Sequence, residues 1–137
     1  MNPHQCVIED PQSFISLLKN LSAEQVEYVK KCHQQDPSTV IDVIEKFIPY
    51  DVLKMCREFA LNPDTPVKVL AKLSDDEDEY IRMYVAYNSN TPVEVLTKLS
   101  NDKNKSVRYY VTQNSNTPAE VLTKMSDDED VYFGKLL

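Results

Sequence analysis

Two runs of acidic residues are the densest groups of potential metal ligands in the sequence. They are Asp75-Asp76-Glu77-Asp78-Glu79 and Asp127-Asp128-Glu129-Asp130. Hard cations such as Ca²⁺ bind several carboxylate oxygens on a flexible loop, so a calcium site is one interpretation. The glycine and the ligand spacing of an EF-hand are missing, however, and carboxylates also stabilise the N-terminal end of a helix dipole. We therefore favour helix starts over a metal site for these acids.

Cysteine and histidine offer a second set of possible ligands, because zinc prefers thiolate and imidazole. These residues are His4, Cys6, Cys32, His33 and Cys56. Cys32 and Cys56 fall at different positions of their predicted helices, and His33 falls in a predicted buried seam, so the pattern does not bring them together. No nucleophile is paired with a nearby base and an orienting acid. We expect buried structural residues here, with no catalytic residue, no metal site and no bound cofactor.

Composition excludes several classes of function. The chain has 137 residues and one glycine, Gly134, whereas nucleotide-binding loops and serine-hydrolase elbows require glycines. With 22 acidic against 15 basic residues the net charge is −7, which repels nucleic acids and anionic membranes. No apolar stretch reaches the ~20 residues of a membrane span. The three cysteines are odd in number and have no C-x-x-C spacing or dense clustering, which suits reduced thiols. We expect a cytoplasmic protein that is not an enzyme and binds neither nucleic acid nor membrane.

A repeat of 26 residues organises the chain. The clearest copies begin with Asn62-Pro-Asp-Thr-Pro, Asn88-Ser-Asn-Thr-Pro and Asn114-Ser-Asn-Thr-Pro, and weaker copies begin at Asp10 and Asp36. Self-similarity at such a period is typical of stacked arrays. The sequence therefore predicts a single repeat domain over 1–137, with a lead at 1–9 and repeats at 10–35, 36–61, 62–87, 88–113 and 114–137.

Each repeat is predicted to contain two short helices. The first helix would begin at a capping box with proline at its first position, as in Thr91-Pro92-Val93-Glu94 and Thr117-Pro118-Ala119-Glu120. The second helix follows a polar link and carries two apolar columns that predict a buried seam. The columns are Val29, Met55, Ile81, Val107 and Phe133, and four residues later His33, Phe59, Val85, Val111 and Leu137.

Each of the three clearest repeats begins with an asparagine, where the second helix of the preceding repeat is expected to end. These residues are Asn62, Asn88 and Asn114. A reversal of the chain usually requires a left-handed residue, and asparagine is the best choice after glycine. We therefore predict a structural role for these asparagines, in the left-handed conformation.

The full pattern resembles a known repeat family. The pattern N-x-[ND]-T-P-x-x-V-L-x-K-[LM]-S, followed by a polar link and Tyr80-Ile-Arg-Met-Tyr-Val-Ala or Val107-Arg-Tyr-Tyr-Val-Thr, resembles the leucine-rich repeat variant family. The match is strong across 62–137 and weaker, in the same register, across 10–61. The resemblance implies an all-α fold, a right-handed α-solenoid of about five two-helix repeats similar to HEAT-like arrays. It implies nothing about activity.

Tyrosine is the residue type that most favours a binding function. Helical geometry places three tyrosines along one flank of a second helix and an arginine on the other, and the next repeat aligns a tyrosine and an arginine with them. The resulting candidate protein-binding ridge is Tyr80, Tyr84, Tyr87, Tyr110, Arg82 and Arg108. Tyrosine and arginine are enriched at binding hot spots. The alternative is that the rings seal the edges between helix layers while the arginines pair with neighbouring acids.

These observations favour a non-catalytic protein–protein interaction module whose partner carries a basic patch. The alternative is a small acidic inhibitor or immunity-type protein that mimics nucleic acid, blocks a nuclease or another enzyme, and binds it in a salt-sensitive way. A HEAT-like DNA glycosylase would need a basic concave face, which the net charge disfavours. The apolar residues Leu136-Leu137 also allow a homo-oligomer through the C-terminal end.

Overall fold

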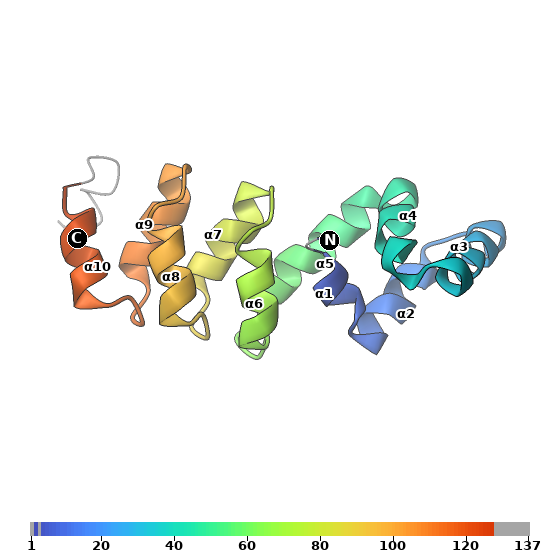
Figure 1. The fold of residues 1–137 in the computed structure, drawn as a ribbon, viewed down its shortest axis with the longest axis horizontal. Helices are drawn as coiled ribbons and strands as arrows, with labels where there is room; N and C mark the ends of the chain where they lie inside the picture. Colours follow the sequence, from blue (N-terminus) through green and yellow to red (C-terminus); the bar gives the residue numbers. More distant parts are fainter. Residues whose placement is uncertain (1, 3, 128–137) are drawn as a thin grey trace. The chain divides into compact units, whose positions relative to one another are not determined.

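The computed structural model describes residue 2 and residues 4–127, and every regular element in these residues is a helix (Figure 1). The prediction of an all-α fold is confirmed. The chain divides into two compact units, residues 1–59 and 60–137. Within the described residues, none of the helices combines the length and the apolar character needed to cross a bilayer. The predictions made for 128–130, Phe133 and Leu136-Leu137 fall outside the described residues.

The first unit is a series of short helices with polar caps. Its elements are α1 (Gln5–Ile8), α2 (Pro11–Lys19), α3 (Ala23–Gln35), the 3₁₀ helix η1 (Pro37–Thr39), α4 (Val40–Phe47) and α5 (Pro49–Leu61), whose last residues belong to the second unit. Asp10 caps α2, since its carboxylate accepts the backbone N–H of Ser13 at 3.0 Å. Ser22 and Gln25 form a complete capping box at the start of α3. Each cap provides acceptors for the N–H groups that a helix start leaves open.

The core of the first unit is aliphatic, and its N-terminal segment is held in place by polar contacts. The buried side chains include Val7, Leu17, Val29, Ile41, Ile44 and Val52. His4 pairs with the carboxylate of Glu45 on α4. Asn2 donates its amide to Asp42 at 2.8 Å and to Glu45 at 3.0 Å. The lead before α2 is therefore attached to α4.

The second unit repeats one pattern of helix, link and helix. Its elements are α6 (Val67–Leu73), α7 (Glu79–Tyr87), α8 (Val93–Leu99), α9 (Lys105–Gln113) and α10 (Ala119–Met125). In Figure 1, α6, α8 and α10 form one row and α7 and α9 form a second, and α7 packs side by side with α9. The starts of α6, α8 and α10 are 26 residues apart, as are those of α7 and α9. Repeated sequence thus produces repeated local structure in this unit.

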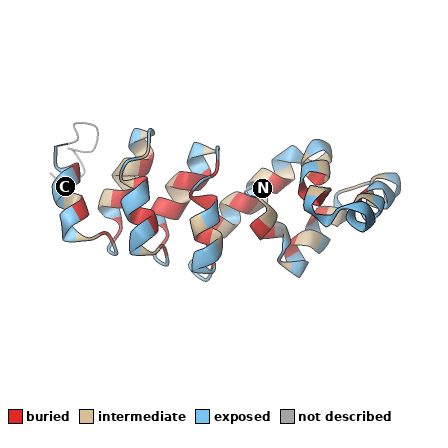
Figure 2. Cartoon of the chain, viewed as in Figure 1, coloured by how far each residue is buried: buried red, intermediate tan, exposed pale blue. Residues whose placement is uncertain are grey.

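The predicted seam of the second helices is mostly buried (Figure 2). Its buried members are Val29, Ile81, Val85, Val107 and Val111. Met55 and Phe59 are half-buried. His33 is exposed, so the prediction that it belongs to the seam is wrong. It lies in the last turn of α3, on a side of the helix that faces solvent.

The asparagines that follow the second helices are not left-handed. Among the described residues none has a positive φ. Asn88 has φ −64° and ψ 129°, and Asn114 has φ −79° and ψ 126°, so both are extended. The predicted left-handed conformation is wrong because the chain leaves each helix in an extended direction and reverses over the following residues instead.

Both asparagine side chains are buried and tie neighbouring repeats together. The Asn88 amide donates to the carbonyl oxygens of Ala60 at 2.7 Å and Asn62 at 2.9 Å. One repeat later, the Asn114 amide donates to the carbonyls of Ala86 at 2.8 Å and Asn88 at 2.9 Å. The accepting carbonyls lie at or just after the ends of α5 and α7, where intrahelical partners run out. The asparagines are structural, as predicted, but through their side chains.

The capping boxes predicted at 91–94 and 117–120 are not formed. The residues at the N-cap positions of α8 and α10 are Pro92 and Pro118, and no side chain caps either helix. The threonines that precede these prolines are buried, and their side chains hydrogen-bond to the preceding helix. Thr91 donates its hydroxyl to the carbonyl of Val85, and Thr117 donates to that of Val111 at 2.6 Å. Each threonine hydroxyl is therefore a second donor to a carbonyl in the last turn of the preceding helix, which also accepts the backbone N–H of Asn88 or Asn114, and it does not cap its own helix.

Candidate protein-binding surface

The predicted tyrosines lie on α7 and α9, the two helices that pack side by side in the second unit. Tyr80 and Tyr87 are 47% and 61% exposed. Tyr84 and Tyr110 are half-buried. Because positions three and four residues apart share a helix face, Tyr80, Tyr84 and Tyr87 lie along one side of α7. This side therefore offers aromatic area to solvent.

The ring of Tyr110 contacts two other tyrosine rings, those of Tyr87 and Tyr109. The ring centroids of Tyr87 and Tyr110 are 5.8 Å apart with planes at 86°, so α7 and α9 meet edge to face. Tyr109 and Tyr110 are 5.4 Å apart with planes at 78°. Such pairs gain energy beyond the area they bury. The contact between Tyr87 and Tyr110 joins neighbouring repeats, as the alternative interpretation expects, while Tyr87 stays largely exposed.

Tyr109 was not among the predicted ridge residues. It aligns with Met83 one repeat earlier, so a comparison of columns did not select it. The sequence feature that could have indicated Tyr109 is its position next to Tyr110, because the rings of adjacent tyrosines can contact each other. We call the group on α7 and α9 the tyrosine surface. Its members are Tyr80, Tyr84, Tyr87, Tyr109 and Tyr110.

Arg82 is not part of an exposed ridge, because it is only 6% exposed. Its Nη1 donates to the carbonyl oxygens of Asp76 at 2.8 Å and Glu77 at 3.1 Å. Its Nε and Nη2 donate to the two carboxylate oxygens of Asp102 at 2.8 Å and 3.2 Å. This bidentate pair connects α7 to the link that precedes α9. At Arg82 the predicted arginine row is wrong, and the alternative of pairing with a neighbouring acid is what the structure shows.

Arg108 reproduces part of this arrangement one repeat later. It is half-buried, and its Nη1 donates to the carbonyl oxygen of Asp102 at 2.7 Å. The hydrogen bond from Arg82 to the carbonyl of Asp76 has the same sequence separation, six residues. Both arginines therefore fix the polar link before their own helix, which a long side chain on the helix flank can reach.

The acids of the links act on the backbone. Asp78 caps α7, and its carboxylate accepts the N–H of Tyr80 at 3.0 Å. Asp76 accepts the N–H of Asp78 at 2.9 Å, and Asp102 accepts that of Asn104 at 2.9 Å. The helix-start interpretation is confirmed for Asp78, which provides the acceptor at the positive end of the helix dipole.

The cysteines and histidines do not gather into a site. Cys6 and Cys56 are buried and Cys32 is half-buried, all three as free thiols. His33 lies exposed on α3, and His4 pairs with a carboxylate. In the part of the chain that the structure describes, no group of three or more His, Cys, Asp or Glu residues is arranged to hold a metal ion.

Comparisons with family models, with curated proteins and with solved structures find no match to this chain. The geometry of the chain itself is therefore what points to its function. That geometry separates a structural set of polar residues, including Arg82, from a tyrosine surface that is still open to solvent.

Proposed function

We propose that this chain is a non-catalytic protein–protein interaction module that binds its partner through the tyrosine surface. The observation that carries the proposal is the cluster of rings on α7 and α9, in which Tyr87 contacts Tyr110 yet keeps 61% of its area exposed. Tyrosine supplies a large contact area with few rotatable bonds and offers a hydroxyl to the partner. Rings already packed edge to face lose less freedom on binding than isolated rings do.

We further infer that the helix pairs are units of a right-handed α-solenoid of about five 26-residue repeats, similar to the leucine-rich repeat variant family. The equal spacing of α6, α8 and α10 supports this inference. So does the recurrence of the same asparagine and threonine hydrogen bonds from one repeat to the next. In such an array each repeat contacts its neighbours, and the stacked helices provide an extended binding surface.

The expected partner carries a basic patch. The whole chain has a net charge of −7, and Glu77 and Glu79 are exposed close to Tyr80 in the sequence. Complementary charge increases the rate of association and orients the encounter. The alternative of an acidic nucleic-acid mimic has less support, because Asp76, Asp78 and Asp102 accept hydrogen bonds within the fold.

Affinity purification from the native cell at two salt concentrations tests the proposal. The baits are the unaltered chain, a Tyr80→Ala/Tyr87→Ala double variant and a Tyr50→Ala control, because Tyr50 is 72% exposed but lies on α5 outside the tyrosine surface. We expect a protein retained at moderate salt by the unaltered chain and by the control, and lost by the double variant. Retention by all three baits would contradict the proposed surface. A nuclease retained only at low salt would favour the inhibitor instead.

A further inference from the structure

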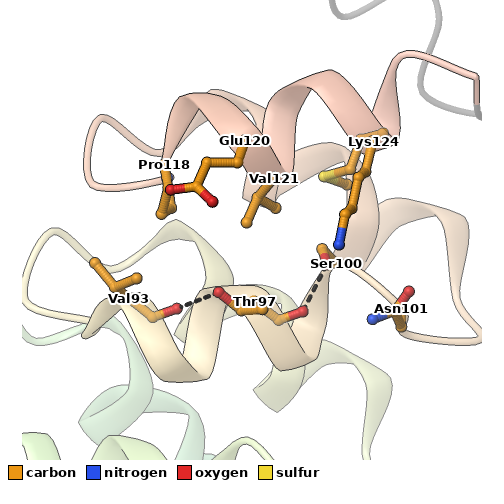
Figure 3. A pocket seen from close by; sticks show the side chains of 9 residues that line it. Val93, Thr97, Ser100, Asn101, Pro118, Glu120, Val121 and Lys124 are labelled. Carbon is orange, nitrogen blue, oxygen red and sulfur yellow. Dashed lines mark hydrogen bonds between the residues drawn. The ribbon is translucent and has the colours of Figure 1, made fainter.

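A pocket of about 430 Å³ lies between α8 and α10 (Figure 3). Its apolar lining is Val93, Pro118, Val121 and Met125. Lys124, Ser100 and Asn101 lie together at one end, with the Lys124 side chain directed toward Ser100. The carboxylate of Glu120 lies nearer the other end, beside Pro118. The pocket thus has an apolar middle and two ends of different charge.

The residues one repeat earlier, at the positions of Lys124 and Ser100, show which group pairs with the lysine. There the ammonium of Lys98 on α8 donates to the carboxylate of Asp75 at 2.8 Å and to the hydroxyl of Ser74. The Ser74 hydroxyl in turn donates to the carbonyl of Ala71, so its oxygen acts as an acceptor for the lysine. Lys98, Ser74 and Asp75 thus satisfy one another, and we call these three residues the closed set.

At the α8–α10 pocket the lysine and serine recur, but the carboxylate does not. Lys124 and Ser100 stand 26 residues after the earlier lysine and serine, and the neutral Asn101 replaces the acid. The Ser100 hydroxyl again donates to a carbonyl, that of Thr97 (Figure 3). Within the described residues, neither Lys124 nor the Asn101 side chain has a hydrogen bond or ion pair. A cation is therefore present without the anion that its counterpart holds.

We infer that this pocket binds an acidic side chain of a peptide segment, with an adjacent apolar side chain over Val121 and Met125. The carboxylate would accept hydrogen bonds from the Lys124 ammonium and from the Asn101 amide, a donor that aspartate lacks. The apolar neighbour would bury area against the middle of the pocket. Glu120 repels a carboxylate at the opposite end, which sets the direction of the peptide. This site is formed mainly by α8 and α10, the first helices of their repeats, and does not depend on the tyrosine surface.

Titration of the whole chain with two short peptides, followed by NMR, tests the inference. The probes are acetyl-Leu-Asp-Leu-amide and its isostere acetyl-Leu-Asn-Leu-amide, which differ only in the charged group. We expect the aspartyl peptide to bind about ten-fold more tightly, because a charge-assisted hydrogen bond is stronger than a neutral one. The shifts should fall on the Asn101 side-chain amide and on the backbone of α8 and α10. Equal affinity, or shifts elsewhere, would overturn the inference.

Reciprocal substitutions make the test specific to the missing carboxylate. Lys124→Met removes the cation and Asn101→Asp supplies an internal competitor, so each should weaken the aspartyl peptide about five-fold or more. Lys98→Met is the matched control and should leave the affinity unchanged, since Lys98 belongs to the closed set. Asp75→Asn should open a second, similar site between α6 and α8. Unchanged affinity in both pocket variants, or an equal loss of affinity in Lys98→Met, would overturn the inference. Neither result bears on the tyrosine surface, which has a separate test.

Discussion

The side-chain amide of Asn114 donates to the backbone carbonyl oxygen of Asn88 at 2.9 Å, and Asn88 donates at the same distance to the carbonyl of Asn62. Each amide also donates to a carbonyl two residues before its first acceptor, Ala86 for one and Ala60 for the other. A helix end leaves carbonyls without intrahelical partners, and these asparagines satisfy them from the next repeat. One residue type thus terminates a helix and joins it to its neighbour.

Loss of the Asn88 side chain should destabilise the second unit strongly. Asn88→Ala removes two donated hydrogen bonds and leaves the buried carbonyl of Ala60 without its side-chain donor, while the carbonyl of Asn62 keeps the backbone N–H of Thr65. The free energy of unfolding should therefore fall by about 2–4 kcal/mol. Asn62→Ala is the matched control, because Asn62 has the same place in its repeat but an exposed side chain. Its expected cost is below about 1 kcal/mol. Urea denaturation of both variants gives the comparison, and equal losses would refute the structural role of the buried amide.

The Arg82–Asp102 pair should matter far more than the Lys98–Asp75 pair. Arg82→Met would leave Asp102, whose side chain is 8% exposed, as a charge without its partner, at a cost of about 3–5 kcal/mol. Lys98→Met breaks a pair whose side chains are 46% and 69% exposed, and should cost less than about 1 kcal/mol. Chemical denaturation of the two methionine variants measures both. Similar costs would mean that burial does not distinguish the pairs.

α3 begins with a side-chain cap, whereas α8 begins without one, so substitutions at the two helix starts should differ in cost. Ser22→Ala breaks the capping box of α3 and should cost about 1 kcal/mol. Glu94→Ala, by contrast, should change stability by less than about 0.5 kcal/mol, because Thr91 does not cap α8. Thermal unfolding of each variant provides the values. A loss for Glu94→Ala as large as that for Ser22→Ala would show that a box forms at α8 after all.

Helix content and burial were predictable from the sequence because they follow local rules. Ile81 and Val85 lie four residues apart on one helical face, and the same spacing recurs at Val107 and Val111. All four are buried. The acidic links were also interpretable, since a carboxylate before a helix is stabilised by its dipole wherever the helix packs.

The polar contacts between repeats were not predictable in the same way. The partners of Asn88 lie 26 and 28 residues earlier, so only the folded chain reveals them. Thr91 matches a capping box locally, yet a carbonyl of the preceding helix is the acceptor that its hydroxyl reaches. Arg82 falls on the expected flank of α7, but its length lets it reach Asp102 in the next link. Each difference arises from a tertiary contact that competes with a local one.

The exposed tyrosines should contribute little to stability. Tyr80 and Tyr87 are 47% and 61% exposed, and the losses in Tyr80→Ala/Tyr87→Ala include the edge-to-face contact of Tyr87 with Tyr110, which is worth about 0.5–1.5 kcal/mol. We therefore expect a melting temperature only a few degrees below that of the unaltered chain. Circular dichroism during heating measures this. A collapse of the melting temperature would indicate that the rings hold the helices together, which is the alternative to a binding role.

The most direct test of the proposed function is the affinity of the purified partner for the same tyrosine variants. Isothermal titration calorimetry would compare the unaltered chain, Tyr80→Ala/Tyr87→Ala and the Tyr50→Ala control at one salt concentration. Hot-spot tyrosines cost at least about 2 kcal/mol on truncation, so the account predicts a Kd raised about thirty-fold or more in the double variant. The control should bind like the unaltered chain. A double variant that folds and binds with an unchanged Kd would contradict the account.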